Sequence, residues 1–474
     1  LPCKWVYRLK ETSDSTTPKY KARLVAKGFR QEYGVDFDEI FLPVVKMTTL
    51  RFMLGVVAAE NLELTLLDIK TAFLHNDLKE EIYMEQSKGF VVSSQKHLIC
   101  RLRKSLYGLK QAPQQWCKKF NDFIHSVGFF KSNEDHCLFT KTTWDGSPIF
   151  LIIYVDGMLF SGRHGGELVE LVRQLRLKFS MKDLGPARHI LAIKTSRLHN
   201  RRELFLSQTD YIGRVLERFN MQLAKSASTP LPINLRLSQQ DCPTFGSKGE
   251  DMKSVLYALA VGSLMYAMVA TRPDISHVVG VVNRFMHNPG WSHWIVVKHV
   301  FRYLAGTKDH DILFGPNPTL GVVGYNNSDF ADCMDNQKST TGYCFKFRNG
   351  AISWKLKLQE CITTSTTEAE YVVASDMTFQ QVFSDSAPIV YNDSQGVVAL
   401  SKNLFTTTPP SISTFNITLL GTASFQGKSV LRRYLQPTMP HMEWPSVFRR
   451  IVSDPIRTRW ASQKIGSVKV GHIT

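Results

Sequence analysis

The chain has 474 residues, which is long for one hydrophobic core and suits two or three domains. Its composition, 43% hydrophobic and 21% charged, is that of a globular protein and excludes a chain disordered throughout. The 58 Lys and Arg outnumber the 41 Asp and Glu, for a formal charge of +17. That excess favours a polyanionic partner, nucleic acid first, with a merely soluble basic protein as the alternative.

Eight cysteines are scattered without a CxxC pair, so we predict neither a zinc site nor a disulfide framework. The longest apolar run, residues 149–155, is too short to span a membrane and reads as a buried strand. We therefore expect no membrane partner. The chain opens Leu-Pro-Cys-Lys without Met or a targeting stretch, so we expect an internal piece of a longer product.

In chain order, residues 4–161 mix short β-rich runs with helical stretches, an α+β pattern with core strands at 64–69 and 149–160. The apolar residues of 111–127 fall at helical spacing, which predicts an amphipathic helix. Two further helices are predicted at 168–179 and 211–219, and they could form a small helical subdomain.

Residues 226–249 carry Pro, Ser and Gly with little periodicity, which is typical of a linker. Helical patterns resume at 254–288, and a strand-rich segment at 320–354 predicts a second globular unit. Beyond residue 402 neither period is present, so we predict no structure there.

Two acidic residues follow apolar strands. The runs 149–155 and 158–161 are separated by Asp156-Gly157, a signal for a two-residue β-hairpin turn. By itself such a pair more often marks only a type I′ turn. However, Asp68 also closes an apolar run, and carboxylates that end adjacent strands can share divalent cations. This pattern favours metal-assisted nucleotide addition.

Around these residues the chain resembles the copia-type reverse transcriptases of retrotransposon Pol polyproteins. The matching blocks are 4–7 (KWVY), 20–29 (YKARLVAKGF), 43–48 (PVVKMT), 67–74 (LDIKTAFL), 105–113 (SLYGLKQAP), 154–156 (YVD), 181–185 (MKDLG) and 271–275 (TRPDI). The resemblance implies a right-hand polymerase of fingers, palm and thumb, followed by a connection and a truncated ribonuclease H-like α/β domain. The implied boundaries are 1–162 for fingers and palm, 163–235 for the thumb, 236–318 for the linker and connection, 319–402 for the partial ribonuclease H and 403–474 for a tail.

The resemblance also implies roles for single residues. Asp68 and Asp156 would hold Mg²⁺ (or Mn²⁺) and act in catalysis. Residues expected to bind the nucleotide and template are Lys21 and Arg23 (triphosphate), Phe73 (sugar selection), and Lys110 and Gln111 (the pocket for template and nucleotide). Without the resemblance, Lys21 and Arg23 would be interpreted as part of an exposed basic strand and Phe73 as a core aromatic residue. Lys110 and Gln111 would be interpreted as the start of a helix.

Two positions depart from the family pattern. Gly157 stands where the family has a second Asp after Tyr-Val-Asp, and Gln114 stands where it has Arg. Gly157 preserves the turn but removes a carboxylate beside the metals, so we expect folding to survive better than catalysis.

A second set of blocks resembles the family's ribonuclease H: 324–332 (GYNNSDFAD), 339–343 (STTGY), 365–371 (STTEAEY) and 391–395 (YNDSQ). Asn327 falls where the first catalytic Asp belongs, and Asn is a poorer Mg²⁺ ligand. Asp329, two residues on, would lie on the same strand face but is a weak substitute. Glu370 and Asp393 stay in register, although a solvated helix face and a strand-end turn are the alternatives.

The final block expected in this family, Lys-His-Ile-Asp-Ile, is missing, and a shifted reading frame after residue 404 could encode it. We therefore expect 403–474 to be a frameshifted, disordered tail and the element to be a damaged copy. Two functions remain open: an RNA-directed DNA polymerase acting on RNA template, DNA primer, RNA–DNA hybrid and dNTPs, or a catalytically dead nucleic-acid-binding relic. A structural module of a host complex has no feature in its favour. The expected location is the cytoplasm, in a virus-like particle, or the nucleus.

Overall fold

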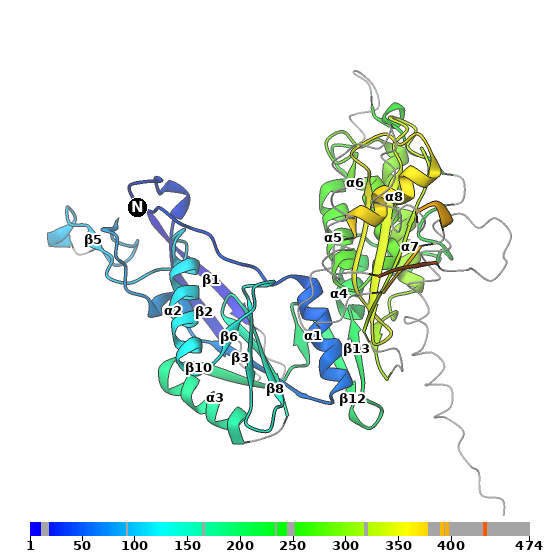
Figure 1. The fold of residues 1–474 in the computed structure, drawn as a ribbon. Helices are drawn as coiled ribbons and strands as arrows, with labels where there is room; N and C mark the ends of the chain where they lie inside the picture. The colour runs from blue at the N-terminus through cyan, green and yellow to red at the C-terminus, as the bar shows by residue number, and fades with distance from the viewer. Residues whose placement is uncertain are drawn as a thin grey trace, which may run out of the picture. The chain divides into compact units, whose positions relative to one another are not determined.

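A computed structural model describes residues 1–10, 19–91, 93–163, 166–232, 235–243, 252–316, 321–377, 389–392, 394–397 and 430–433. Helices and sheets are mixed, as the α+β pattern predicted. The chain forms two compact units (Figure 1). Unit 1 holds residues 1–46 and 62–187, and unit 2 holds residues 47–61 and the chain from 188 onward.

A six-stranded antiparallel sheet is the centre of unit 1 (Figure 1). Its order is β10 (Met181–Pro186), β3 (Glu63–Ile69), β9 (Gly157–Gly162), β8 (Pro148–Tyr154), β7 (Leu138–Thr142) and β6 (Phe130–Lys131). The central strands β8 and β9 are buried almost throughout, which is why they are apolar without alternation. Both strands coincide with the apolar runs predicted at residues 149–155 and 158–161.

Helix α2 (Ala112–Ser126) packs on this sheet through its apolar face, as the spacing predicted. Trp116 and Phe120 are buried, and the Phe120 ring meets Phe139 of β7 edge-on with centroids 6.1 Å apart. Pro113 lies in the first turn, where its missing amide costs no hydrogen bond. Helix α3 (Gly166–Lys178) buries Leu175 in the same unit.

The remaining strands of unit 1 form two small antiparallel sheets. β1 (Cys3–Lys10) pairs with β2 (Lys19–Ala26) in a two-stranded ribbon, and β4 (Tyr83–Met84) pairs with β5 (Cys100–Arg101). Because strand residues alternate between faces, Lys21 and Arg23 share one face of the ribbon. Short 3-10 helices occur at η1 (Gly28–Arg30), η2 (Ala72–His75) and η3 (Ser93–Gln95).

Four helices build the main core of unit 2: α4 (Thr209–Arg218), α5 (Tyr257–Ala270), α6 (Ser276–Asn283) and α7 (Trp291–Gly306). The same unit contains a four-stranded sheet of β11 (His189–Ile190), β12 (Ile193–Leu198), β13 (Glu203–Ser207) and β14 (Ile312–Phe314). Its 3-10 helices are η4 (His199–Arg201), η5 (Gln239–Asp241) and η6 (Pro273–Ile275).

A five-stranded sheet completes unit 2 in the order β17 (Gly350–Leu358), β16 (Thr340–Phe347), β15 (Val322–Ser328), β18 (Ile389–Asn392) and β19 (Val430–Arg433). The first three strands are antiparallel, whereas β18 and β19 run parallel to β15. Helix α8 (Thr366–Asp376) packs against β15 and begins with a Ser365 side-chain cap.

Helix α1 (Met47–Ala59) belongs to unit 2, although both of its flanking segments belong to unit 1. Buried Arg51 donates to the carbonyls of Val269, Ala270 and Ile352 and lies 3.8 Å from the Trp354 ring centroid. Two of these carbonyls end helix α5, where a cation complements the helix dipole. Burial lowers the pKa of Arg51 to about 9, so the guanidinium stays charged at neutral pH. Arg51 thus joins α1 to α5 and β17.

The boundaries of the compact units differ from the predicted domain boundaries at residues 162, 235 and 318. The sheet of unit 1 continues to Pro186 because β10 pairs with β3. The predicted helical subdomain of 168–179 and 211–219 is wrong, since α3 lies in unit 1 and α4 packs on α5 and α7 in unit 2. Local periodicity located both helices but could not assign their partners.

The prediction of a structureless tail is wrong for Val430–Arg433, which pairs with β18 as β19. An unpaired strand edge presents free amide and carbonyl groups that favour such an addition. The rest of residues 403–474 lies outside the described residues. Within the described part of the chain, no helix is both long and apolar enough to cross a membrane.

The TRPDI block supplies a buried ion pair at the centre of unit 2. Arg272 and Asp274 form a salt bridge of 2.7 Å with side chains 0% and 2% exposed. Tyr303 also donates to Asp274 (2.9 Å), and Arg272 donates to the Thr307 carbonyl (2.8 Å). All of these groups are satisfied, which a buried pair requires.

Asp274→Ala should therefore destabilise unit 2 by about 3–5 kcal/mol, because it leaves Arg272 charged and buried without its partner. Hydrogen–deuterium exchange of α5 and α7 amides in the intact chain measures this change. Glu360→Ala is the matched control, since it breaks the exposed Lys357–Glu360 pair and should leave that exchange unchanged. Equal effects of the two variants would contradict the role of the buried pair.

Candidate active site

Asp68 and Asp156 are brought together by the pairing of β3 with β9. Asp68 lies directly opposite Gly157, the residue that follows Asp156 in the chain. The amide of Ile69 donates to the carbonyl of Asp156 at 2.9 Å. Facing residues of antiparallel strands have Cα atoms about 4.5–5.5 Å apart. The two predicted metal-binding carboxylates therefore come from neighbouring backbone positions at one end of the paired strands.

The turn that carries Asp156 is centred one residue earlier than predicted. Tyr154 pairs with Gly157, so the two turn residues are Val155 and Asp156, and Gly157 already opens β9. Buried Ile153 faces buried Met158, and the ladder continues with buried Ile152 opposite buried Leu159. Core packing, rather than the Asp-Gly pair, sets this register.

Gly157 leaves a space that the Tyr154 ring fills. A Cβ atom added at Gly157 would lie 2.6 Å from Cε2 and 2.7 Å from Cζ of Tyr154. Gly157 has no positive φ in this structure, so the restriction comes from the ring and not from the backbone. The position that lacks the family's carboxylate is thus occupied by a neighbouring phenol.

The charges of Asp68 and Asp156 affect the pKa values of two tyrosines, Tyr154 and Tyr107. Burial, followed by the charges of Asp68 and Asp156, raises the pKa of Tyr154 to about 12. Burial is also the largest cause of the raised pKa of Tyr107, where Arg23 opposes the shift and the two carboxylates add to it. Each phenol therefore lies within electrostatic reach of both Asp68 and Asp156.

Two of the predicted nucleotide-binding residues converge on Tyr107. The Arg23 guanidinium lies 5.2 Å from the Tyr107 ring centroid. Phe73 meets the same ring edge-on with centroids 5.1 Å apart. Lys21 is exposed on the ribbon face that carries Arg23. A cation, an aromatic ring and the carboxylate pair thus surround one phenol.

Lys110 and Gln111 are directed toward the segment around Gln31. Lys110 donates from Nζ to the Gln31 carbonyl at 3.3 Å and lies 4.5 Å from the Phe37 ring centroid. Gln111 is only 1% exposed, accepts from Gln31 Nε2 at 3.0 Å and donates to the Asp36 carbonyl at 2.9 Å. Both residues anchor a loop, and their contact with a nucleotide stays a prediction.

The donor set fits a hard divalent cation only in part. Magnesium is commonly held by one or two carboxylates, with water and substrate phosphates completing its shell, and Asp68 with Asp156 can supply these two. Among the described residues, no group of three or more His, Cys, Asp or Glu side chains is placed to hold a metal. Gly157 supplies no third carboxylate.

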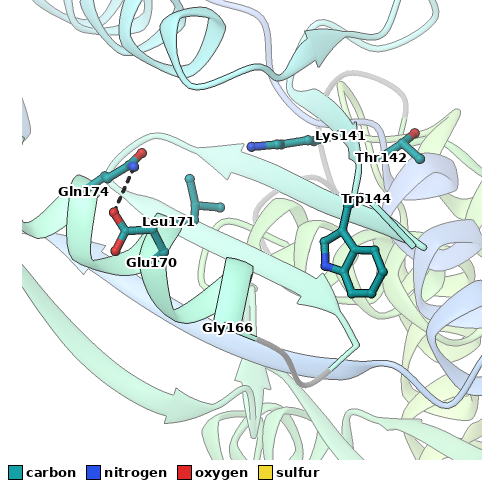
Figure 2. A pocket seen from close by; sticks show the side chains of 7 residues that line it. All are labelled: Lys141, Thr142, Trp144, Gly166, Glu170, Leu171 and Gln174. Atoms are coloured by element: carbon teal, nitrogen blue, oxygen red, sulfur yellow. Dashed lines mark hydrogen bonds between the residues drawn. The ribbon is translucent and has the colours of Figure 1, made fainter. Parts of the chain in front are cut away.

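A separate pocket of about 390 Å³ lies elsewhere in unit 1 (Figure 2). It is lined from β7 and the turn after it by Lys141, Thr142 and Trp144, and from α3 by Glu170, Leu171 and Gln174. Glu170 is already paired with Arg173 and accepts from Gln174. None of the predicted site residues lines this pocket.

In the segment that resembles ribonuclease H, the Glu370 carboxylate accepts hydrogen bonds from neutral groups. Its carboxylate is 7% exposed and accepts from the Ser328 amide (2.6 Å) and from Asn392 Nδ2 (3.1 Å). Asn392 Nδ2 also donates to Asn326 Oδ1 at 3.1 Å. Strand alternation puts buried Asn326 and half-buried Asn327 on opposite faces of β15. The residue that shares this network with Glu370 is therefore Asn326, not the predicted Asn327.

Asp329 is predicted to share a strand face with Asn327, but β15 ends one residue before it, at Ser328. Its carboxylate instead accepts from the Thr340 amide at 2.5 Å and closes the connection to β16. Burial raises the pKa of Asp329, and the hydrogen bond from Thr340 opposes that shift. Asp393 lies outside the described residues.

Comparisons with known proteins show which family the chain resembles. Residues 1–233 match the family model described as reverse transcriptase (RNA-dependent DNA polymerase). The Pol polyprotein of tobacco transposon TNT 1-94 is 50% identical over 413 residues, 85% of this chain and 31% of that protein. A transposon Ty5-1 protein of Saccharomyces cerevisiae is 30% identical over 312 residues, 65% of this chain and 98% of that protein. A solved foamy viral protease-reverse transcriptase in complex with double-stranded DNA has a TM-score of 0.48 at 10% identity, covering 92% of this chain and 68% of that chain.

The chain belongs to the reverse transcriptase family of copia-type retrotransposon Pol polyproteins. It spans about a third of the length of the tobacco polyprotein.

The contact between Tyr154 and Gly157 can be measured by a double-mutant cycle. Gly157→Ala should cost about 1–3 kcal/mol of unfolding free energy, because the added Cβ forces the Tyr154 ring to move. In a Tyr154→Ala background the same change should cost clearly less. Gly166→Ala, where an added Cβ meets nothing within 4 Å, is the control. Equal costs of Gly157→Ala in both backgrounds would show that the ring does not fill this space.

Proposed function

We propose that the chain is an RNA-directed DNA polymerase that adds deoxynucleotides to a DNA primer on an RNA or DNA template. The observation that supports this most directly is the β3–β9 register, which sets Asp68 beside the turn of Asp156. In the proposed right-hand arrangement, the β1–β2 ribbon belongs to the fingers and the six-stranded sheet to the palm. The thumb and connection follow, and the five-stranded sheet with α8 is the ribonuclease H-like part.

Each chemical task of this proposed reaction has a candidate residue in the chain. Asp68 and Asp156 would hold Mg²⁺ (or Mn²⁺), which supplies charge neutralisation on the transferred phosphoryl group and activation of the attacking hydroxyl. Arg23 and Lys21 bind the triphosphate as fixed cations. Phe73 limits the room beside the sugar and so favours a deoxyribose.

Tyr107 orders the groups that would meet the nucleotide. Its ring contacts both Arg23 and Phe73, and its phenol lies within reach of the carboxylate pair. The partners implied are an RNA template, a DNA primer, their hybrid and dNTPs. The +17 formal charge supports such polyanionic partners through counterion release.

A second candidate function is that of a nucleic-acid-binding relic without catalysis. It is favoured by Gly157, which supplies no carboxylate, and by the Tyr154 ring beside it. It is also favoured by the network of Asn326, Asn392 and Glu370, in which the Glu370 carboxylate accepts from the side-chain amide of Asn392. We therefore expect weak or absent polymerase activity in this copy.

Gly157→Asp should raise primer extension on a primed RNA template in Mg²⁺, because it returns a carboxylate beside the metal pair. Gly157→Asn is the matched control: it has the same size and displaces the Tyr154 ring equally, but carries no charge. Initial rates of dNTP incorporation compare the three proteins. Equal turnover by the Asp and Asn variants would refute the role given to this position.

Ribonuclease H activity should be absent in the chain and in Gly157→Asp alike, since the two sites share no ligand. Glu370 is held by an amide and by Asn392, and Asn327 supplies no carboxylate, so the charge needed to hold two cations is missing. Cleavage of a labelled RNA–DNA hybrid measures this activity. Hybrid cleavage that Asp393→Asn or Glu370→Gln abolishes would overturn the assignment.

A further inference from the structure

The turn that carries Asp156 has a backbone conformation that its own residues do not favour. Val155 has φ of 59°, in the left-handed region that β-branched residues rarely adopt. Its side chain is 49% exposed, so burial of that side chain does little to hold the turn. A group outside the hairpin must contribute to holding this conformation.

Trp116 of α2 is such a group. Its indole Nε1 donates to the carbonyl of Val155 at 2.8 Å. The indole is 1% exposed, and its ring packs near Phe120 and Phe179 with centroid distances of 5.7 and 5.3 Å. A donor packed this closely has little freedom to follow a moving acceptor, so α2 fixes where the Val155 carbonyl points.

The peptide groups on both sides of the Asp156 Cα atom are therefore held from outside the hairpin. The Val155 carbonyl accepts from Trp116, and the Asp156 carbonyl accepts from the Ile69 amide of β3 at 2.9 Å. With both peptide planes fixed, the direction of the Asp156 Cα–Cβ bond is fixed as well. Asp68 lies on the same β3 strand that supplies the second bond.

We propose that Trp116 is a positioning residue of the active site, which holds the Asp156 carboxylate toward Asp68 through the Val155 carbonyl. This inference rests on the proposed function, because it assigns Asp156 a cation to bind. It adds a role for α2 that does not involve contact with substrate. The hydrogen bond, and not only the bulk of the indole, carries that role.

Trp116→Phe in the intact chain keeps an aromatic ring and removes the donor. It should weaken Mn²⁺ binding, followed by the electron paramagnetic resonance signal of free Mn²⁺, by about 10–100-fold, as loss of a ligand-orienting partner typically does. Trp354→Phe is the matched control, because it also removes an indole-to-carbonyl hydrogen bond, to Met268 in unit 2. It should leave Mn²⁺ affinity unchanged.

Adding Val155→Gly to Trp116→Phe should recover part of the lost Mn²⁺ affinity, because glycine accepts a positive φ without help. This rescue separates a backbone effect from general loss of packing. Unchanged Mn²⁺ affinity in Trp116→Phe, or no recovery with Val155→Gly, would overturn the inference.

Asp156→Asn distinguishes this failure from failure of the proposed function. If Asp156→Asn weakens Mn²⁺ binding and Trp116→Phe does not, only the role of Trp116 is lost. If Asp156→Asn leaves Mn²⁺ binding unchanged, the proposed metal site itself is wrong, and the role of Trp116 is lost with it.

Discussion

The register between β3 and β9 is the constraint on which the first site depends. It sets Asp68 opposite Gly157, and the bond from the Ile69 amide to the Asp156 carbonyl then fixes the turn beside it. The register is itself held by the packing of buried strands, because a shift of one residue would change every cross-strand side-chain contact between them. The position of two acidic groups at the ends of these strands is thus a consequence of apolar packing within the sheet.

This dependence explains how the chain can keep its fold at a position, such as Gly157, that supplies no carboxylate. Gly157 remains in the β8–β9 ladder without a side chain, and the Tyr154 ring fills the space. In the five-stranded sheet, Asn326 and Asn392 join Glu370 by hydrogen bonds that require no cation. In both places neighbouring side chains either fill the space or make the hydrogen bonds at the position concerned. We therefore expect substitution of a ligand to change the chemistry of a site more than the stability of its scaffold.

Patterns confined to one element could be predicted from the sequence, whereas partners distant in sequence could not. The apolar runs located β3, β8 and β9, and the helical spacing located α2. The turn register was missed because it follows from core packing across two strands. The assignment of α1 to unit 2 was not predicted, because it depends on hydrogen bonds from Arg51 to the carbonyls of Ala270 and Ile352. In the sequence, Trp116 could be recognised only as an apolar position of a helix, and Tyr107 only as a residue of the 105–113 block.

The central claim is that Asp68 and Asp156 share one divalent-cation site. Anomalous diffraction from crystals of the chain grown with Mn²⁺, primed template and a dNTP tests it most directly. We expect manganese peaks between the two carboxylates, with their oxygens within roughly 8 Å of one another, since paired ions in such sites lie about 3.5–4 Å apart. Manganese bound elsewhere, or carboxylates held clearly farther apart with nucleic acid in place, would contradict it.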